Sequence, residues 1–211
     1  MALELGAKRV FATALDWPGW CRGGTDEPGA IEALLAYAPR YAAVVARAGM
    51  AIPPDPVPAV VERLAGGSGT DFGAPGVMAE DERRPTTAAE GERLAAVMTA
   101  CWAAFDEIAA ASPESLRKGP RGGGRGRSKM VEHVVEAERG AYARRLGVRH
   151  PPFSADDVTA RDALRSDLLA VLRTPSDGGP VVEKGWTVRF ATRYMAWHVL
   201  DHAWEMEDRR E

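Results

Sequence analysis

The stretch Trp197-His198-Val199-Leu200-Asp201-His202-Ala203-Trp204-Glu205 decides how this chain is organised. Its two histidines are four residues apart, so on a helix they share one face, close enough to hold a single metal ion. A step of about 100° per residue also keeps Tyr194, Asp201 and Glu205 within about 60° of the direction of His198. A helix packed in an apolar core would carry leucine, isoleucine or valine there. The stretch therefore predicts a helix with a polar, ligand-bearing face.

A third histidine favours a metal site. The chain has only 4 histidines, and His133 lies on another predicted helix beside small residues. Three imidazoles inside a helical bundle could bind one divalent ion. Two plainer interpretations stay open, since His198 and His202 could be hydrogen-bonded core residues or could face solvent. The remaining histidine, His150, precedes two prolines, and we interpret it as an exposed loop residue and not a ligand.

The composition limits the classes of function. The 211 residues suit one large domain or two small ones, and 45% hydrophobic with 27% charged residues is a globular balance. A net charge of −3 gives no basic field, so a nucleic-acid partner is not expected. The sequence has no run of about 18 apolar residues, so a membrane span is not expected. The N-terminus lacks the apolar segment of a signal peptide. Cys21 and Cys101 form no C-x-x-C pair, which favours a cytoplasmic location.

The first 80 residues predict a small α/β domain. Strand-like residues 8–15 are followed by the turn Asp16-Trp17-Pro18-Gly19 and by a short second strand over 20–22. Thr25 or Asp26 can cap the helix that comes next. The order of these pieces predicts a small sheet with a helix on one face.

Residues 16–34 resemble the HicB-like antitoxin fold, which carries a strand, a Pro-Gly turn, a second strand and a capped helix with a Glu-Ala-Leu pattern. The resemblance covers roughly the first 65 residues and implies an interaction or scaffold role. A plain α/β appendage packed on the helical part stays open as the alternative. Residues 57–64 predict a further strand, and 70–85 predict a linker that contains the domain boundary.

From residue 87 the pattern turns helical. Capping boxes open two of the predicted helices, Thr87-Ala88-Ala89-Glu90 and Ser154-Ala155-Asp156-Asp157, and Ser128 caps another. The four predicted helices extend over about residues 87–111, 128–146, 154–172 and 187–208. In the first of them we interpret Met98 and Cys101 as core residues. The third has the predicted buried stripe Val158, Leu164, Leu168, Val171 and Leu172.

The second of these helices presents a candidate site face. His133 shares that face with Glu136, Ala137, Gly140 and Arg144, and the small residues let a neighbouring helix or a ligand come close. Its other apolar residues face away from His133 and need separate cover; they are Val131, Val135, Tyr142 and Leu146.

A histidine on the second helix and H-x-x-x-H on the fourth resemble the DinB/YfiT-like superfamily of metal-binding four-helix bundles. Residues 124–139 and 193–209 carry this resemblance, which covers about residues 87–211. It implies a C-terminal bundle domain over 81–211 and a zinc or nickel ion bound by His133, His198 and His202. It also implies a transferase or isomerase that uses a low-molecular-weight thiol such as bacillithiol or mycothiol.

The sequence thus predicts an α+β fold and a divalent-metal-dependent transferase, isomerase or hydrolase. Three neutral imidazoles leave a metal at least one open position. Asp201, Glu205 and Glu136 are candidate catalytic residues that could orient an imidazole or accept a proton, although each could equally form a salt bridge with Arg144 or Arg209. The alternative function is a non-catalytic metal-binding or antitoxin-like interaction module.

Candidate substrate-binding residues are mostly basic. The glycine-rich segment 116–127 is either a solvated connector or a basic lip that attracts an anionic substrate. The candidates are Arg121, Arg125, Arg127, Arg144 and Tyr194. Phe190, Trp197 and Trp204 form a second stripe on the last helix, which predicts cover by the N-terminal domain or by a second copy in a homodimer.

Overall fold

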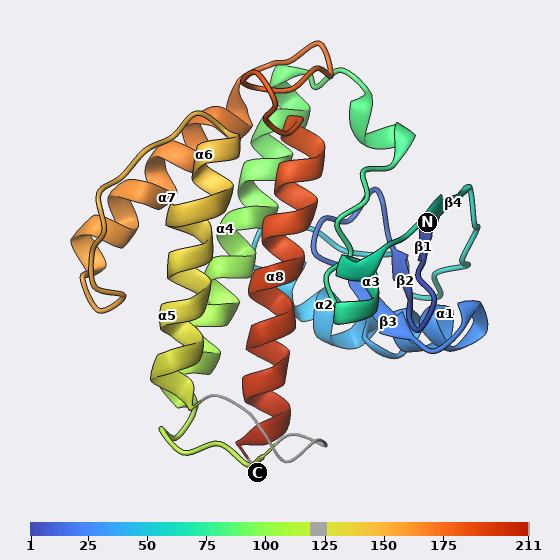
Figure 1. Ribbon diagram of the computed structural model, residues 1–211, viewed down its shortest axis with the longest axis horizontal. Coiled ribbons are helices and arrows are strands. Elements are labelled where there is room, and N and C mark those ends of the chain that lie inside the picture. Colours follow the sequence, from blue (N-terminus) through green and yellow to red (C-terminus); the bar gives the residue numbers. More distant parts are fainter. Residues whose placement is uncertain (119–125, 211) are drawn as a thin grey trace.

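The computed structural model describes residues 1–118 and 126–210, so Arg121 and Arg125 lie outside the described residues (Figure 1). Within these residues the chain forms a 4-stranded sheet with short helices, beside a group of longer helices that run side by side. The α+β class predicted from the sequence is therefore confirmed.

The sheet consists of β1 (Ala2–Leu5), β2 (Val10–Thr13), β3 (Cys21–Gly24) and β4 (Glu62–Ala65), in the order β3-β2-β1-β4. β1 pairs antiparallel with β2 and parallel with β4, and β2 pairs antiparallel with β3. The sequence did not predict β1. The strand predicted over 57–64 is mostly wrong, because β4 can extend only as far as its short partner β1 provides hydrogen bonds.

Two helices follow the first strands and confirm the predicted capped helix. α1 (Glu27–Ala36) begins after Asp26, whose carboxylate accepts a hydrogen bond from the backbone nitrogen of Gly29 at 2.8 Å. α2 (Ala38–Ala46) has a proline in its first turn, which explains the break between the two helices. α1 packs on β2 and β3, while α2 packs on the helical part of the molecule.

Residues 70–85, which the sequence predicted to be a linker, contain secondary structure. They include the end of α3 (Ser68–Phe72) and the 3-10 helix η1 (Glu80–Arg83). From α8 (Val188–Arg209), the Nε atom of Arg193 donates to Glu82 Oε1 at 2.7 Å, and its other nitrogens donate to the carbonyls of Pro75 and Val77. The segment is ordered because it supplies the acceptors that this buried arginine requires.

The longer helices are α4 (Ala88–Ala111), α5 (Arg127–Ala137), α7 (Val158–Arg173) and α8. α4 packs against both α7 and α8, and α5 continues through the π-helical turn η2 (Glu138–Tyr142) into the short α6 (Ala143–Arg145). These boundaries agree with the predicted helices to within a few residues.

The helix caps were predicted with mixed success. The Thr87–Glu90 capping box is present at the start of α4. Ser128 does not cap α5, because its hydroxyl donates to Glu114 at 2.6 Å and the cap position is Gly126. The Ser154–Asp157 box is also wrong, since Asp157 itself caps α7 by accepting from the backbone nitrogen of Ala160 at 3.0 Å.

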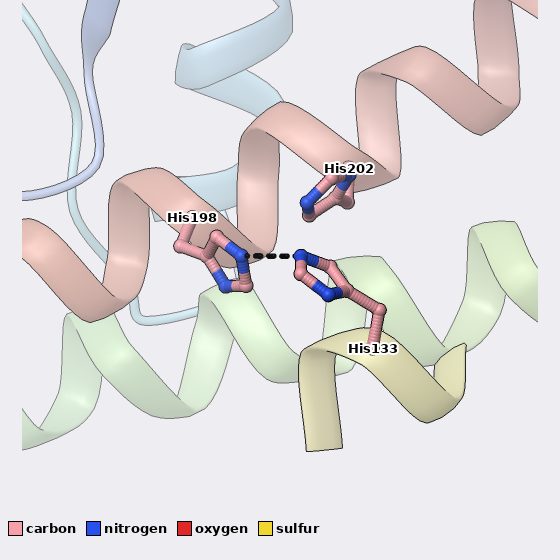
Figure 2. A group of neighbouring side chains, drawn as sticks. All are labelled: His133, His198 and His202. Atoms are coloured by element: carbon pink, nitrogen blue, oxygen red, sulfur yellow. Dashed lines mark hydrogen bonds between the residues drawn. The ribbon is translucent and has the colours of Figure 1, made fainter. Parts of the chain in front are cut away.

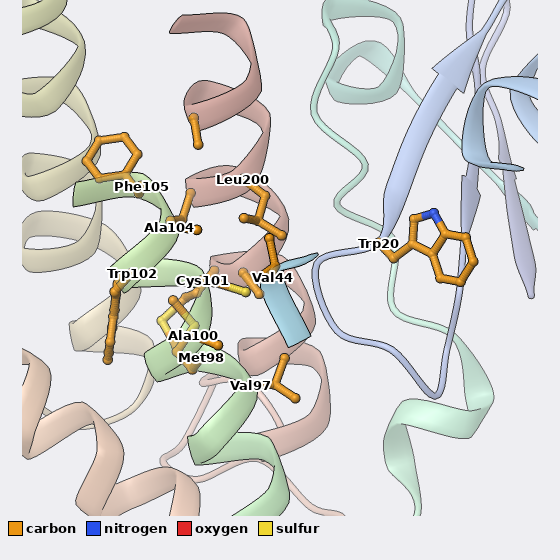
Figure 3. Packing of buried hydrophobic residues seen from close by; sticks show 14 of the residues in the cluster. Trp20, Val44, Val97, Met98, Ala100, Cys101, Trp102, Ala104, Phe105 and Leu200 are labelled. Atoms are coloured by element: carbon orange, nitrogen blue, oxygen red, sulfur yellow. The ribbon is translucent and has the colours of Figure 1, made fainter. Parts of the chain in front are cut away.

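One hydrophobic core joins the sheet side to the helical side. Figure 3 shows Met98 and Cys101 of α4 packed near Leu200 of α8, with Trp20 contributed from the N-terminal part. The interpretation of Met98 and Cys101 as core residues is confirmed, since both are fully buried. Val158 is 54% exposed and does not join the α7 stripe, because it is the first residue of the helix and lies beyond the packed part.

α4 corrects the expectation that no segment is long and apolar enough to cross a membrane. It passes that test by length and composition. However, 56% of its most apolar window is buried inside the protein, which is also the behaviour of a core helix in a soluble fold. Its burial between α7, α8 and α2 explains the composition without a bilayer.

The second apolar stripe of α8 is covered by the N-terminal part of the chain. Trp197 and Trp204 are only 5% and 2% exposed. Phe11 of β2 packs edge-on against Trp197 with ring centroids 6.4 Å apart, and Tyr37 packs against Trp204 at 5.0 Å. The predicted cover by the N-terminal domain is confirmed, while the homodimer stays a prediction.

Candidate metal centre

Two helices bring three histidines to one place. His198 and His202 lie one turn apart on α8, and His133 faces them from α5 (Figure 2). One ring nitrogen from each lies within 4.8 Å of the others, and the Nε2 atoms of His133 and His198 are 3.2 Å apart. Two ligands of a tetrahedral ion, each at about 2.1 Å, stand about 3.4 Å apart. The predicted convergence is confirmed, and the group could hold a metal ion.

The rings are packed against one another. Their centroids are 4.7 to 5.1 Å apart, and His202 stands nearly perpendicular to both of the others. His198 is only 7% exposed, whereas His133 and His202 are partly exposed. The cluster therefore has a buried side and a side that small molecules can approach.

Glu205 orients one of the rings. Its Oε2 atom lies 3.2 Å from Nδ1 of His202, and its Oε1 atom accepts a hydrogen bond from Arg209 at 2.8 Å. The contact with His202 and the charge of Arg209 lower the pKa of Glu205, so the carboxylate is ionised near neutral pH. An ionised carboxylate accepts the Nδ1 proton and leaves the Nε2 lone pair of His202 for a metal ion.

The other two candidate carboxylates pair with arginines that the sequence did not suggest. Asp201 accepts a hydrogen bond from Arg22 of β3 at 3.0 Å, which links α8 to the sheet. Glu136 forms a two-pronged pair with Arg139 on the same helix. These pairs agree with the plainer interpretation of both carboxylates as members of salt bridges.

His133 borders a groove on the outer face of α5 and α6. The groove has a volume of about 790 Å³, and Lys129, Glu132, Glu136 and Arg144 also line it. Arg144 thus lies in the same groove as His133, as the shared helix face predicted. The lining thus has three cationic side chains, counting Lys129 and Arg139, against two carboxylates.

The structure places Arg127 elsewhere. It is the first residue of α5, where it donates to the carbonyl of Ser112 at 3.0 Å and pairs with Glu114 at 3.3 Å. These contacts fix the start of the helix. His150, predicted to be exposed, instead has a side chain only 16% exposed and lies 2.8 Å from Asp167, because the loop folds back onto α7.

Sequence reasoning missed Tyr142. A regular helix would turn it to the opposite side from His133, nine residues earlier. In the structure its ring lies 5.4 Å from the ring of His198 and 5.5 Å from that of Tyr194. The expectation that Tyr142 faces away from the site is wrong, because the π-helical turn η2 adds an extra residue to the helix. Gly140, in mid-helix, is the local signal that could have suggested an irregular turn.

A second missed residue is Glu138, at the start of η2. Its carboxyl is completely buried and accepts a hydrogen bond from the indole nitrogen of Trp102 on α4. Burial raises the pKa of Glu138, an effect that the nearby charge of Arg165 opposes. This contact ties the irregular turn to the centre of the helical part.

No protein-family model matches the chain, and no match was found among curated proteins or among solved structures. The likenesses to the HicB-like and DinB/YfiT-like families therefore rest on the residues quoted for them. The evidence for the histidine cluster is the distance between its ring nitrogens in the structure.

Proposed function

We propose that this protein is a divalent-metal-dependent enzyme whose ion is bound by His133, His198 and His202. One observation carries the proposal: three imidazole nitrogens from two helices lie within 4.8 Å of one another. His133 and His198 are 65 residues apart along the chain. Three histidine ligands with an open fourth position are typical of catalytic zinc sites. The bound ion would supply Lewis acidity and lower the pKa of a water or thiol that it coordinates.

The surroundings favour a small anionic substrate. The cations Lys129, Arg139 and Arg144 outnumber the carboxylates in the lining of the groove that His133 borders, so an anion can be attracted to the exposed side of the cluster. Arg121 and Arg125, which lie outside the described residues, stay predicted contributors. Glu205 is the carboxylate that we assign to the site, because it contacts a proposed ligand directly. Its role is to hold His202 in the tautomer and orientation that ligation requires.

The reaction class follows from the resemblance to the DinB/YfiT-like superfamily over the helical domain, residues 81–211. We propose a cytoplasmic transferase, isomerase or hydrolase with zinc or nickel, and a low-molecular-weight thiol as cosubstrate. A coordinated thiol gains nucleophilicity near neutral pH because the ion stabilises its deprotonated form.

Metal analysis of the purified full chain tests the site. We expect one zinc or nickel ion per chain, and loss of that ion in His133→Ala, His198→Ala and His202→Ala. His150→Ala is the matched control, because His150 lies against Asp167 and is not in the cluster. A full chain that binds no divalent ion would contradict the proposal.

Cobalt substitution then separates an enzyme from the non-catalytic alternative. We expect the visible spectrum of the cobalt-loaded protein to change when a small thiol is added, because an open position accepts a new ligand. A spectrum that does not respond would favour a closed, structural site. Turnover is to be sought by presenting thiols with electrophilic acceptors to the metal-loaded protein, with His198→Ala as the inactive reference.

A further inference from the structure

The π-helical turn changes which residue faces the histidines. At about 100° per residue, nine residues of α-helix would place Tyr142 about 180° from His133. The extra residue of a π-turn removes about one such step, which brings Tyr142 to within about 80° of the direction of His133. The contact between the Tyr142 and His198 rings is the result. Such turns are frequent at functional sites in helices.

Tyr142 does not stand alone beside the cluster. Its ring lies 5.5 Å from the rings of both Trp186 and Tyr194, which are themselves 5.3 Å apart. All three side chains are half-buried, although they are large and partly apolar. Tyr194 lies one turn before His198 on α8, so this aromatic surface continues directly from the histidines.

The aromatic surface has a rigid backing. Phe190 stacks on Tyr194 with ring centroids 5.7 Å apart, and Trp197 lies 5.3 Å from the same ring. Both backing residues are buried, and Phe11 of β2 packs edge-on against Trp197. Half-buried aromatic rings on a fixed support resemble the walls of ligand sites, where apolar surface and a few polar groups converge.

We propose that Tyr142, Trp186 and Tyr194 form an aromatic shelf that binds an aromatic ring of the substrate beside the metal ion. The inference rests on the proposed function and adds the substrate class: a small anion that carries an aromatic group. The ring packs on the shelf, while Lys129 and Arg144 attract the charge from the groove. The shelf residues act on specificity and need not touch the reacting atoms.

Two hydroxamates that differ in one ring test the shelf. Acetohydroxamate and benzohydroxamate coordinate a metal ion through the same group, so a difference in affinity reports on the phenyl ring. We expect the zinc-loaded full chain to bind benzohydroxamate about tenfold more tightly in calorimetry, equal to about 1.4 kcal/mol. Trp186→Leu and Tyr194→Leu should each reduce that preference, and Tyr142→Leu should do the same.

Phe72→Leu is the matched control, because Phe72 is 89% exposed on α3 and its ring is not part of the shelf. Zinc content is measured for every variant, and we expect it to stay at the level of the original chain. Tyr142→Phe keeps the ring and should keep the preference.

The possible failures are distinct. If zinc binds but the two hydroxamates bind equally, the shelf is overturned and the metal site stands. A preference that persists in both Trp186→Leu and Tyr194→Leu also overturns the shelf. If zinc binds and neither hydroxamate does, the open position of the proposed enzyme is contradicted, and the shelf with it. A chain that binds no zinc overturns both.

Discussion

Helix α8 carries two polar clusters whose composition differs. Arg193 is matched by Glu82 and by backbone carbonyls, and the two side chains are only 4% and 5% exposed. His198, five residues later, lies beside His133 and His202, which are partly exposed. The first cluster joins opposite charges, whereas the second brings together three side chains of one kind. The difference separates a pair whose charges match within the fold from a group that could hold a metal ion.

The largest expected effect concerns the buried pair of Arg193 and Glu82. Arg193→Ala leaves the carboxylate of Glu82 buried without its cation, so we expect a loss of about 3–5 kcal/mol in the free energy of unfolding. Urea denaturation followed by tryptophan fluorescence measures it. Arg63→Ala removes a partner of Glu27 at the surface and should cost far less than Arg193→Ala, because that pair is exposed. Equal losses in the two variants would remove the distinction between buried and exposed pairs.

The histidine cluster should respond to metal instead. Zinc at about 100 times its dissociation constant should raise the free energy of unfolding by about 2.7 kcal/mol, because it binds the folded chain. A chelator should reverse the gain, and His198→Ala should abolish it. The measurement is thermal or urea unfolding with and without zinc. If His198→Ala gains as much as the original chain, the ion binds elsewhere.

The contact between Glu205 and His202 predicts a smaller effect, on zinc affinity. Glu205→Gln keeps the shape of the side chain but removes the charge that accepts the His202 proton, so zinc affinity should fall about 10–100-fold. Asp201→Asn is the matched control on the same helix, since Asp201 pairs with Arg22, and zinc affinity should not change. Competition with a zinc-binding dye gives both affinities. Similar losses in the two variants would assign the effect to helix stability.

The smallest expected effect concerns the ion pair between Glu90 and Arg189. Hydrogen bonds from Thr87 and then from Arg189 lower the pKa of Glu90 to about 2. A folded-state pKa below the unfolded value contributes stability above about pH 4.5, and this is lost as the pH falls towards 2. Glu90→Gln should therefore be less stable than the original chain at pH 7, with a difference that shrinks below pH 4.5. Urea midpoints at pH 7, 4 and 3 check this, and a constant difference would contradict it.

Local rules were sufficient for part of the fold. The Thr87–Glu90 capping box and the Asp26 cap formed as predicted, because each needs only neighbours three residues away. The candidate metal site also began as a local pattern, since the four-residue spacing of His198 and His202 fixes their shared face on any helix. His133 was identified by its residue type and by the resemblance, and the structure supplied its distance to His198 and His202.

Contacts between distant segments decided the rest. Nothing near residue 193 in the sequence predicts Glu82, and nothing near Asp201 predicts Arg22, because these pairs depend on how α8 packs on the sheet side. Tyr142 was assigned to the wrong face because a constant step per residue holds only in a regular helix. The sequence by itself thus determined the helices and two of the three histidines on one face. Only the tertiary structure decided which side chains meet across helices, since packing, not local spacing, selects the π-turn and the partners of buried charges.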